Sequence, residues 1–145
     1  METKTHYKFI QWRDTGGLHE DTTITISDLK FLQDELHFLT DLASEETLEM
    51  IYGISHEASA FVAEKLQACQ NRVEHLLEAF QLHSNRLQTL LDDTEIPNEL
   101  EEYKDAHYNL MISAMKLHGD VKKVKQRVFN MLAEVMQKSK EKRSN

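Results

Sequence analysis

The feature that most constrains the fold is an unbroken heptad repeat near the end of the chain. Eleven side chains there, ten of them apolar or aromatic and one a histidine, recur at alternating steps of three and four: Leu100, Tyr103, His107, Leu110, Ala114, Leu117, Val121, Val124, Val128, Met131 and Val135. This spacing places them along one side of an α-helix, and about five repeats are typical of coiled-coil-like packing. The pattern predicts one long helix over about 97–138, with Pro97 at its first position, where a missing N–H costs nothing. Beyond Met136 no apolar face continues, so we expect the last turns to fray.

Two earlier segments show the same kind of periodicity. A second seam predicts a helix over about 55–91, with Ser55 as its N-cap: Leu66, Cys69, Val73, Leu76, Phe80, His83, Leu87 and Leu90. A third predicts a helix over about 22–43, with a face that Phe31, Phe38 and Leu42 widen: Leu29, Leu32, Leu36, Leu39 and Ala43. The acidic connector between these two helices has room for one helical turn. Residues 1–19 lack this periodicity and contain the Gly16–Gly17 pair, so we interpret them as an extended arm.

These segments define an all-α fold class. The chain has 145 residues with only 4 Gly and 1 Pro, too little turn punctuation for a many-stranded β fold. Three long helices joined by short connections predict an antiparallel up-down-up three-helix bundle with coiled-coil-like helices and an N-terminal extended arm. At this length we expect a single domain over residues 1–145.

Composition excludes several classes of protein. The single Cys excludes an intrachain disulfide, and the first twenty residues hold no continuous apolar stretch. We therefore expect a cytoplasmic protein that does not enter membranes. With 17 Lys and Arg against 25 Asp and Glu, the net charge is −8, which argues against nucleic-acid binding. No motif indicates catalysis or a bound cofactor, so we expect that the protein is not an enzyme and has no cofactor.

The charge is unevenly distributed along the sequence. Residues 1–115 hold 8 basic and 22 acidic side chains, whereas residues 116–145 hold 9 basic and 3 acidic ones. In an antiparallel bundle the basic end of the third helix would lie beside acidic side chains around residues 41–64, and we expect intramolecular pairing there. Docking of the basic end on an anionic surface is the less favoured alternative.

The predicted helix lengths do not match. A first helix beginning near residue 22 would leave the hairpin of the second and third helices protruding, with many large apolar side chains uncovered. Cover by the arm, by a second copy of the chain, or by both would solve this, and a homodimer is the favoured prediction. The expected interaction surface consists of the arm and this hairpin tip: Phe9, Trp12, Phe80, Leu87, Leu90, Leu91 and Tyr103. An earlier start of the first helix would shrink the mismatch.

The chain contains eight histidines, and two pairs fall level across the predicted hairpin. These pairs are His83 with His107 and His75 with His118, and His19 and Glu20 could come near them. Imidazoles gathered in a bundle core could hold a transition metal. However, no Glu-x-x-His or His-Glu-x-x-His motif is present. We therefore favour His83 and His107 as core polar residues, hydrogen-bonded to each other or to water, which predicts an acid-sensitive fold.

One stretch resembles a known group of sequences. Phe9-Ile10-Gln11-Trp12, Leu18-His19-Glu20 and the run from Ser27 to Leu39 resemble short helical proteins of Bacteroidetes, especially marine flavobacteria. The resemblance covers about residues 9–42. It implies a bacterial cytoplasmic setting and no catalytic residue, since the group has no assigned activity.

Together these observations predict a non-enzymatic helical bundle that acts through self-association or through binding another protein. The alternative is a metal- or small-ligand-binding bundle that uses His75, His83, His107 and His118. Substitutions on the hairpin tip would break the first kind of site, and substitutions of the histidines would break the second.

Overall fold

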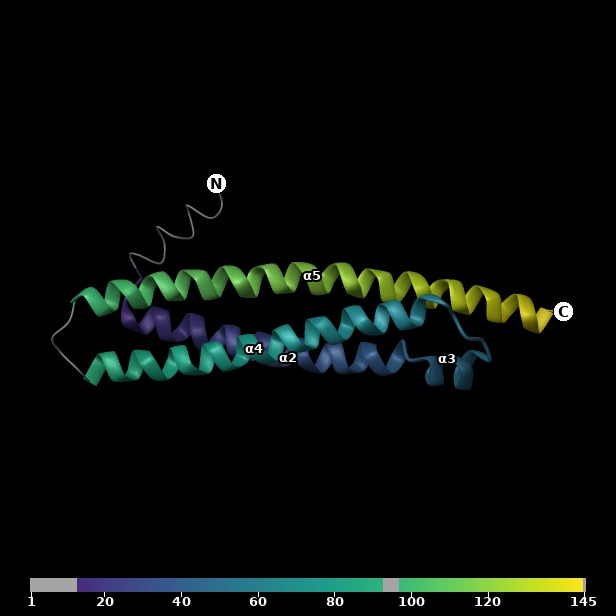
Figure 1. Ribbon diagram of the computed structural model, residues 1–145, viewed down its shortest axis with the longest axis horizontal. Coiled ribbons are helices and arrows are strands. Elements are labelled where there is room, and N and C mark those ends of the chain that lie inside the picture. The colour runs from purple at the N-terminus through teal and green to yellow at the C-terminus, as the bar shows by residue number, and fades with distance from the viewer. Residues whose placement is uncertain (1–12, 93–96, 145) are drawn as a thin grey trace. The chain divides into compact units, whose positions relative to one another are not determined.

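The computed structural model describes residues 13–92 and 97–144, and these form four α-helices with short connections (Figure 1). The helices are α2 (Thr15–Leu42), α3 (Glu45–Tyr52), α4 (Ala58–Asp92) and α5 (Pro97–Ser144). The described residues contain no β-strand. The prediction of an all-helical protein is therefore confirmed. In the same residues, no helix is long and apolar enough to cross a membrane.

Helix α2 begins at Thr15, well before the start near residue 22 that its apolar pattern predicts. Its first turn is capped by Asp14, whose Oδ1 accepts a hydrogen bond from the Gly17 N–H at 2.7 Å. The predicted arm over 1–19 is therefore wrong for residues 15–19, which are helical. The Gly16–Gly17 pair concealed this start, because glycine is a weak helix former away from a cap.

Two threonines also disguise the heptad at the start of α2. Thr22 and Thr25 are buried and continue the seam back from Leu29 to Leu18. The Thr22 hydroxyl donates to the Leu18 carbonyl oxygen at 3.0 Å, and the Thr25 hydroxyl contacts the Met111 sulfur at 3.4 Å. Because these hydroxyls have partners, polar side chains can occupy core positions here.

The connector between α2 and α4 contains a two-turn helix, where the sequence suggested at most one turn. Ser44 caps α3 by accepting a hydrogen bond from the Thr47 N–H at 3.2 Å. Gly53 ends it with φ of 68°, a left-handed conformation that favours glycine. Helix α4 then begins at Ala58, and its first N–H donates to Nδ1 of His56 at 3.0 Å, so His56 and not Ser55 caps this helix.

Helix α5 begins at Pro97 as predicted but runs past residue 138 to Ser144. The seam continues through Ser139, which is buried and donates to the Tyr52 carbonyl oxygen at 3.2 Å. The Lys142 ammonium donates to the Gly53 carbonyl oxygen at 3.1 Å. These contacts hold the last turns against the end of α3, and the expectation that they fray is wrong.

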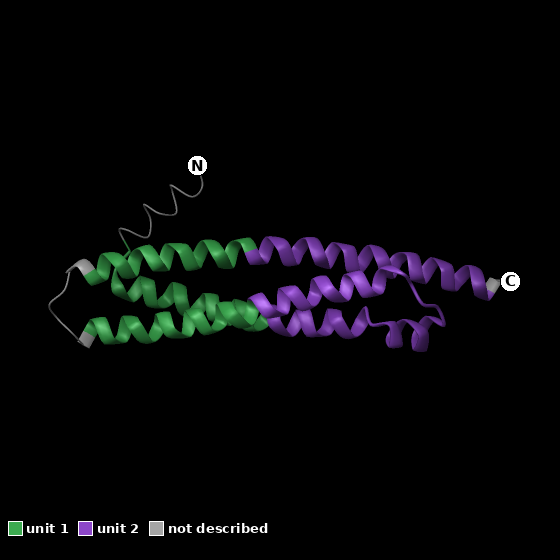
Figure 2. Ribbon diagram, viewed as in Figure 1, with its two compact units in different colours: residues 1–31, 73–116 green, residues 32–72, 117–145 purple. Residues whose placement is uncertain are grey.

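The chain divides into two compact units, coloured separately in Figure 2. Unit 1 contains residues 1–31 and 73–116, and unit 2 contains residues 32–72 and 117–145. In unit 1, segments of α2, α4 and α5 meet in a core around Leu18, Leu87 and Tyr103. Each of these three helices thus contributes one fully or almost fully buried large side chain to that core.

Unit 2 has its own contacts between helices. The Gln70 amide donates to the Thr40 hydroxyl at 2.8 Å, which joins α4 to α2. Lys125 pairs with Glu35 at 3.0 Å, which joins α5 to α2. The prediction that basic residues of α5 pair within the chain is confirmed for Lys125, although its partner lies in α2, before the acidic segment that the sequence suggested.

Candidate functional site

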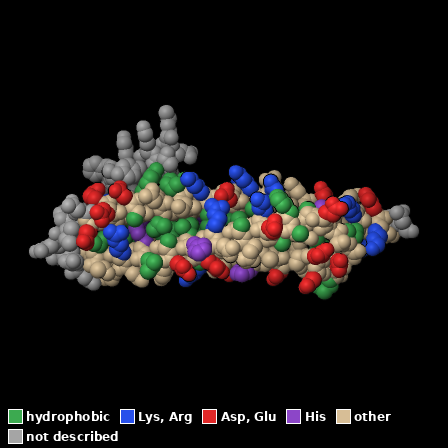
Figure 3. All heavy atoms as spheres, viewed as in Figure 1, with side chains coloured by type: hydrophobic (Ala, Val, Ile, Leu, Met, Phe, Trp, Pro, Cys, Tyr) green, Lys and Arg blue, Asp and Glu red, His purple; other side chains and the backbone are tan. Residues whose placement is uncertain are grey.

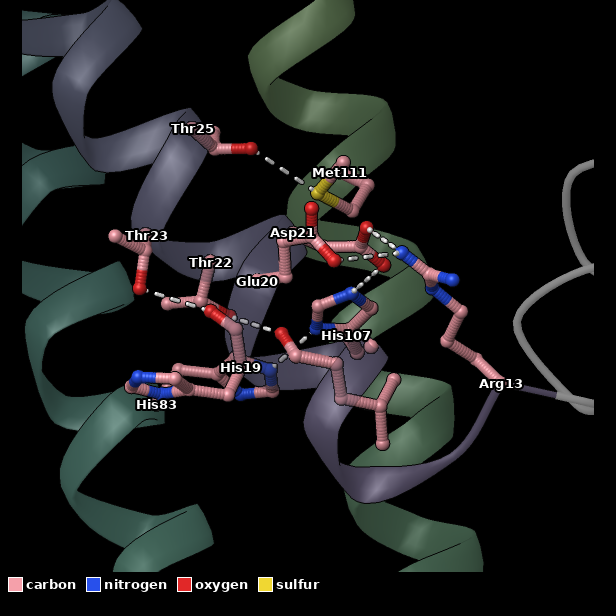
Figure 4. Close-up of polar contacts among 12 residues, drawn as sticks. Arg13, His19, Glu20, Asp21, Thr22, Thr23, Thr25, His83, His107 and Met111 are labelled. Carbon is pink, nitrogen blue, oxygen red and sulfur yellow. Dashed lines mark hydrogen bonds and ion pairs between the residues drawn. The ribbon is translucent and has the colours of Figure 1, made fainter.

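The most distinctive chemistry of the described residues is a chain of hydrogen bonds through the core of unit 1. His83 Nε2 lies 2.9 Å from His107 Nδ1, and His107 Nε2 lies 3.2 Å from Asp21 Oδ2. The Arg13 guanidinium lies 3.2 Å from the other carboxylate oxygen of Asp21. Figure 4 shows Asp21 between Arg13 and His107. We call Arg13, Asp21, His107 and His83 the polar relay.

The relay has a fixed direction. The Asp21 carboxylate can only accept, so Nε2 of His107 carries a proton, and in the neutral imidazole Nδ1 is then an acceptor. His83 must then donate from its Nε2. This pattern of donors and acceptors applies to the two neutral imidazoles, and each then holds a defined tautomer because of its neighbour.

Stacked rings enclose the inner end of the relay. The His83 ring stacks on Tyr103 with centroids 3.9 Å apart and lies 5.0 Å from the His107 ring. Phe80 meets the His83 ring edge-on at 6.4 Å. His83 is 5% exposed and His107 is fully buried. The two imidazole rings thus fill volume in the core and also form hydrogen bonds.

Burial sets the protonation of both histidines. Desolvation, then His107 and then Arg86, lowers the pKa of His83 from 6.5 to about 4. Desolvation also lowers the pKa of His107, against the opposing effect of its hydrogen bond to Asp21. Near neutral pH the pair is therefore uncharged, and a second proton on the pair would meet a like charge.

Tyr103 has a perturbed hydroxyl beside the relay. No hydrogen-bond partner with good geometry lies near it within the described part of the chain, although Thr22 is close enough to lower the pKa of the phenol. Burial outweighs this effect and raises the pKa to about 12. The hydroxyl therefore stays protonated throughout the physiological range.

Gly17 makes room for the outer end of the relay. A Cβ at this position would lie 2.5 Å from Nε of Arg13, closer than real contacts allow. The absence of a side chain at Gly17 therefore lets Arg13 fold back along the first turn of α2 and reach Asp21. Glu20 adds a longer ion pair to Arg13 at 3.8 Å.

We expect Gly17→Ala to affect stability in opposite ways depending on Arg13. In an Arg13→Ala background, alanine should raise the free energy of unfolding by up to about 1 kcal/mol, because alanine is the better helix former. With Arg13 present, this gain should shrink or reverse, since the methyl group displaces the guanidinium from Asp21. Denaturant unfolding of the four chains in this double-mutant cycle measures the coupling. Equal effects of Gly17→Ala in both backgrounds would contradict it.

The predicted metal ligands do not converge. His83 and His107 are buried and hydrogen-bonded directly to each other, whereas His75 and His118 are exposed. Among the residues that the structure describes, no group of three or more His, Cys, Asp and Glu side chains is placed to hold a metal ion. The pair that forms this hydrogen bond is the pair that lies on both apolar seams.

The predicted interaction surface is also different from what the structure presents. Phe80, Leu87 and Tyr103 are buried and Leu90 is half-buried. The early start of α2 brings Leu18 into one cluster with Leu87, Leu90 and Tyr103. Leu91 is exposed. Phe9 and Trp12 lie outside the described residues. The chain's own α2 therefore covers part of the hairpin tip, and the predicted mismatch of helix lengths shrinks accordingly.

A surface pocket of about 380 Å³ lies in unit 1 beside the first turn of α2. His19, which the sequence placed near the histidine pairs, lines it. The other lining residues come from α2 and α4: Thr15, Gly16, Ser84, Asn85, Leu87, Gln88 and Leu91. The pocket therefore presents the His19 imidazole, hydroxyl and amide groups and two leucines, and its described lining contains no Asp, Glu, Lys or Arg side chain.

Sequence reasoning missed Asp21 and Arg13. Asp21 directly precedes the buried Thr22, and its place beside His107 follows only once α2 is extended back to Thr15. The available signal was Asp14 followed by Thr15-Gly16-Gly17, an N-cap residue before a helical first turn. Arg13 lies immediately before that cap, outside the helix, so no periodic pattern could indicate its role.

Comparisons with known proteins give no relative: no family model, no curated protein and no solved structure matches this chain.

Proposed function

We propose that this chain is a non-enzymatic cytoplasmic protein that acts by associating with a second copy of itself, with a further protein partner as its target. In this proposal α2, α4 and α5 form an up-down-up three-helix bundle. The polar relay serves the fold. Its histidines are neutral, buried and paired, so it fixes which residues face one another and contributes no reactive group.

The observation that carries the proposal is the exposed apolar surface of α2. Phe31 is 72% exposed, and Ile24, one heptad earlier on the same helix, is 52% exposed. Both belong to unit 1, and we call them the α2 strip. The next heptad position, Phe38 in unit 2, is 64% exposed. Side chains seven residues apart lie on the same side of a helix, and a repeated aromatic on an outer face is typical of an association surface.

The surroundings of the α2 strip fit a protein partner. Along the helix, Phe31 lies one turn from Asp28 and Asp34, both of which are exposed. An apolar centre with a charged rim is the usual composition of a protein interface. On the face seen in Figure 3, hydrophobic side chains likewise reach the surface among acidic and basic ones.

The test is a single charge placed on the α2 strip. Phe31→Glu should weaken self-association at least about tenfold, because a buried aromatic anchor at an interface typically contributes more than 1 kcal/mol. Leu82→Glu is the matched control, since Leu82 is 70% exposed on α4 in the same unit. Sedimentation equilibrium measures both. Equal dissociation constants for the two variants would overturn the assignment of the surface.

A further inference from the structure

We infer that the α2 strip of one copy binds a second exposed strip, on α5 of another copy. This inference rests on the proposed self-association and names its partner surface. The second strip lies in unit 2 and consists of Phe129 and Met136, which are 51% and 46% exposed. We call these two residues the α5 strip.

The α5 strip has the geometry of a helix-packing face. Phe129, Ala133 and Met136 follow the spacing i, i+4, i+7, and Ala133 is also exposed. These positions share one side of α5. Two large side chains separated by a small one allow a neighbouring helix to approach closely. The α2 strip presents the complementary protrusions, Ile24 and Phe31.

Charge selects this pairing over the symmetric ones. Helix α2 carries six acidic residues and one basic residue, Lys30, whereas residues 116–144 of α5 carry nine basic and three acidic residues. Contact between two α2 strips or between two α5 strips would therefore bring like charges together. Contact between an α2 strip and an α5 strip brings opposite charges together, which favours both encounter and specificity.

The same pairing chemistry already occurs within one copy. In unit 2, Lys125 of α5 reaches Glu35 of α2 at 3.0 Å. Lys122, which is exposed one heptad before Phe129, carries the matching charge on the α5 strip. Asp28, which is exposed one turn before Phe31, is its counterpart on the α2 strip.

Cysteine cross-linking tests the inference. The full chain is made in a Cys69→Ala background, once with Phe31→Cys and once with Phe129→Cys, and one of the two chains is isotope-labelled. On mild oxidation of the mixture, the disulfide joining residue 31 of one copy to residue 129 of the other should dominate, because disulfides form only between closely spaced residues. Phe31→Cys mixed with Leu82→Cys is the control and should give little cross-link.

A charge exchange gives a second readout. Asp28→Lys and Lys122→Glu should each weaken the dimer about two- to fivefold at low salt, and mixing the two variants should restore part of the loss. A dimer that forms only cross-links between two residues 31 would overturn the α2–α5 pairing while leaving self-association intact. A chain that stays monomeric would overturn both the pairing and the proposed function.

Discussion

Acidification from pH 7 to pH 4 is expected to lower the free energy of unfolding through His83 by about 3 kcal/mol. Above pH 6.5 the side chain is neutral in both the folded and the unfolded chain, so pH has no effect through it. Between pH 6.5 and about 4, His83 binds a proton in the unfolded chain but stays neutral in the folded chain. Stability should therefore fall across this window, by up to about 1.4 kcal/mol per pH unit in its middle.

The neighbours of His83 determine that direction. It faces His107 and Tyr103 of α5, Arg86 lies on its own helix, and Asp21 of α2 reaches it only through His107. No carboxylate contacts His83 directly among the interactions of the described residues. A proton on His83 would therefore lie in the core beside a ring that donates its own N–H to Asp21. The pKa of His107 is also lowered in the folded chain, so this residue too should reduce the free energy of unfolding as the pH falls.

Denaturant unfolding at several pH values measures this effect. The double variant His83→Leu, His107→Leu should lose most of the slope between pH 6.5 and about 4, because it removes both protonation sites from the core. His75→Gln, at an exposed histidine of the same unit, is the control and should follow the parent chain. Parallel stability curves for the parent and the double variant would contradict the burial of a neutral pair.

Truncation of Leu18 should destabilise the chain by about 2 to 5 kcal/mol. Leu18 is fully buried against Leu87 and Tyr103, so Leu18→Ala removes apolar contact and leaves a cavity in the core of unit 1. Had the first helix begun near residue 22, as its apolar pattern suggested, this side chain would lie in an arm and its loss would cost much less.

The control for this variant is Leu82→Ala, which makes the same chemical change at an exposed position. Its effect on the free energy of unfolding should stay within about 0.5 kcal/mol. Urea unfolding of both variants gives the comparison. If Leu18→Ala were as mild as Leu82→Ala, the first turns of α2 would not cover the core of unit 1.

The long seams could be predicted from sequence because they repeat without interruption. In α5, for example, Leu117, Val121 and Val128 are all buried as their spacing requires. The level pairing of His83 with His107 followed from simple counting across an antiparallel hairpin. Their hydrogen bond confirms that counting.

The start of α2 and the end of α5 could not be predicted in the same way, and the two ends share one physical reason. At both misjudged ends the core position is occupied by a polar side chain: Thr22 and Thr25 near the start of α2, and Ser139 near the end of α5. Each is buried because its hydroxyl finds a partner in the fold. A pattern of apolar residues cannot reveal such positions, since their burial depends on tertiary contacts.

The late start predicted for the first helix also changed the predicted interaction surface. A first helix that begins too late leaves the hairpin tip uncovered, which made the tip the expected interaction surface, and it gives Asp21 no place beside His107. The apolar pattern also puts Phe31 and Phe38 on a widened core face, whereas both are strongly exposed. Their actual exposure is what moves the proposed association surface from the hairpin tip to α2.

Native mass spectrometry of the untagged chain, purified without an immobilised-metal column, tests the central claim of self-association most directly. It reports subunit number and bound mass in one spectrum. We expect a species of twice the 17.0 kDa chain mass with no additional mass, and Phe31→Glu should shift the population toward single chains. A single 17.0 kDa chain across the accessible concentration range would contradict it.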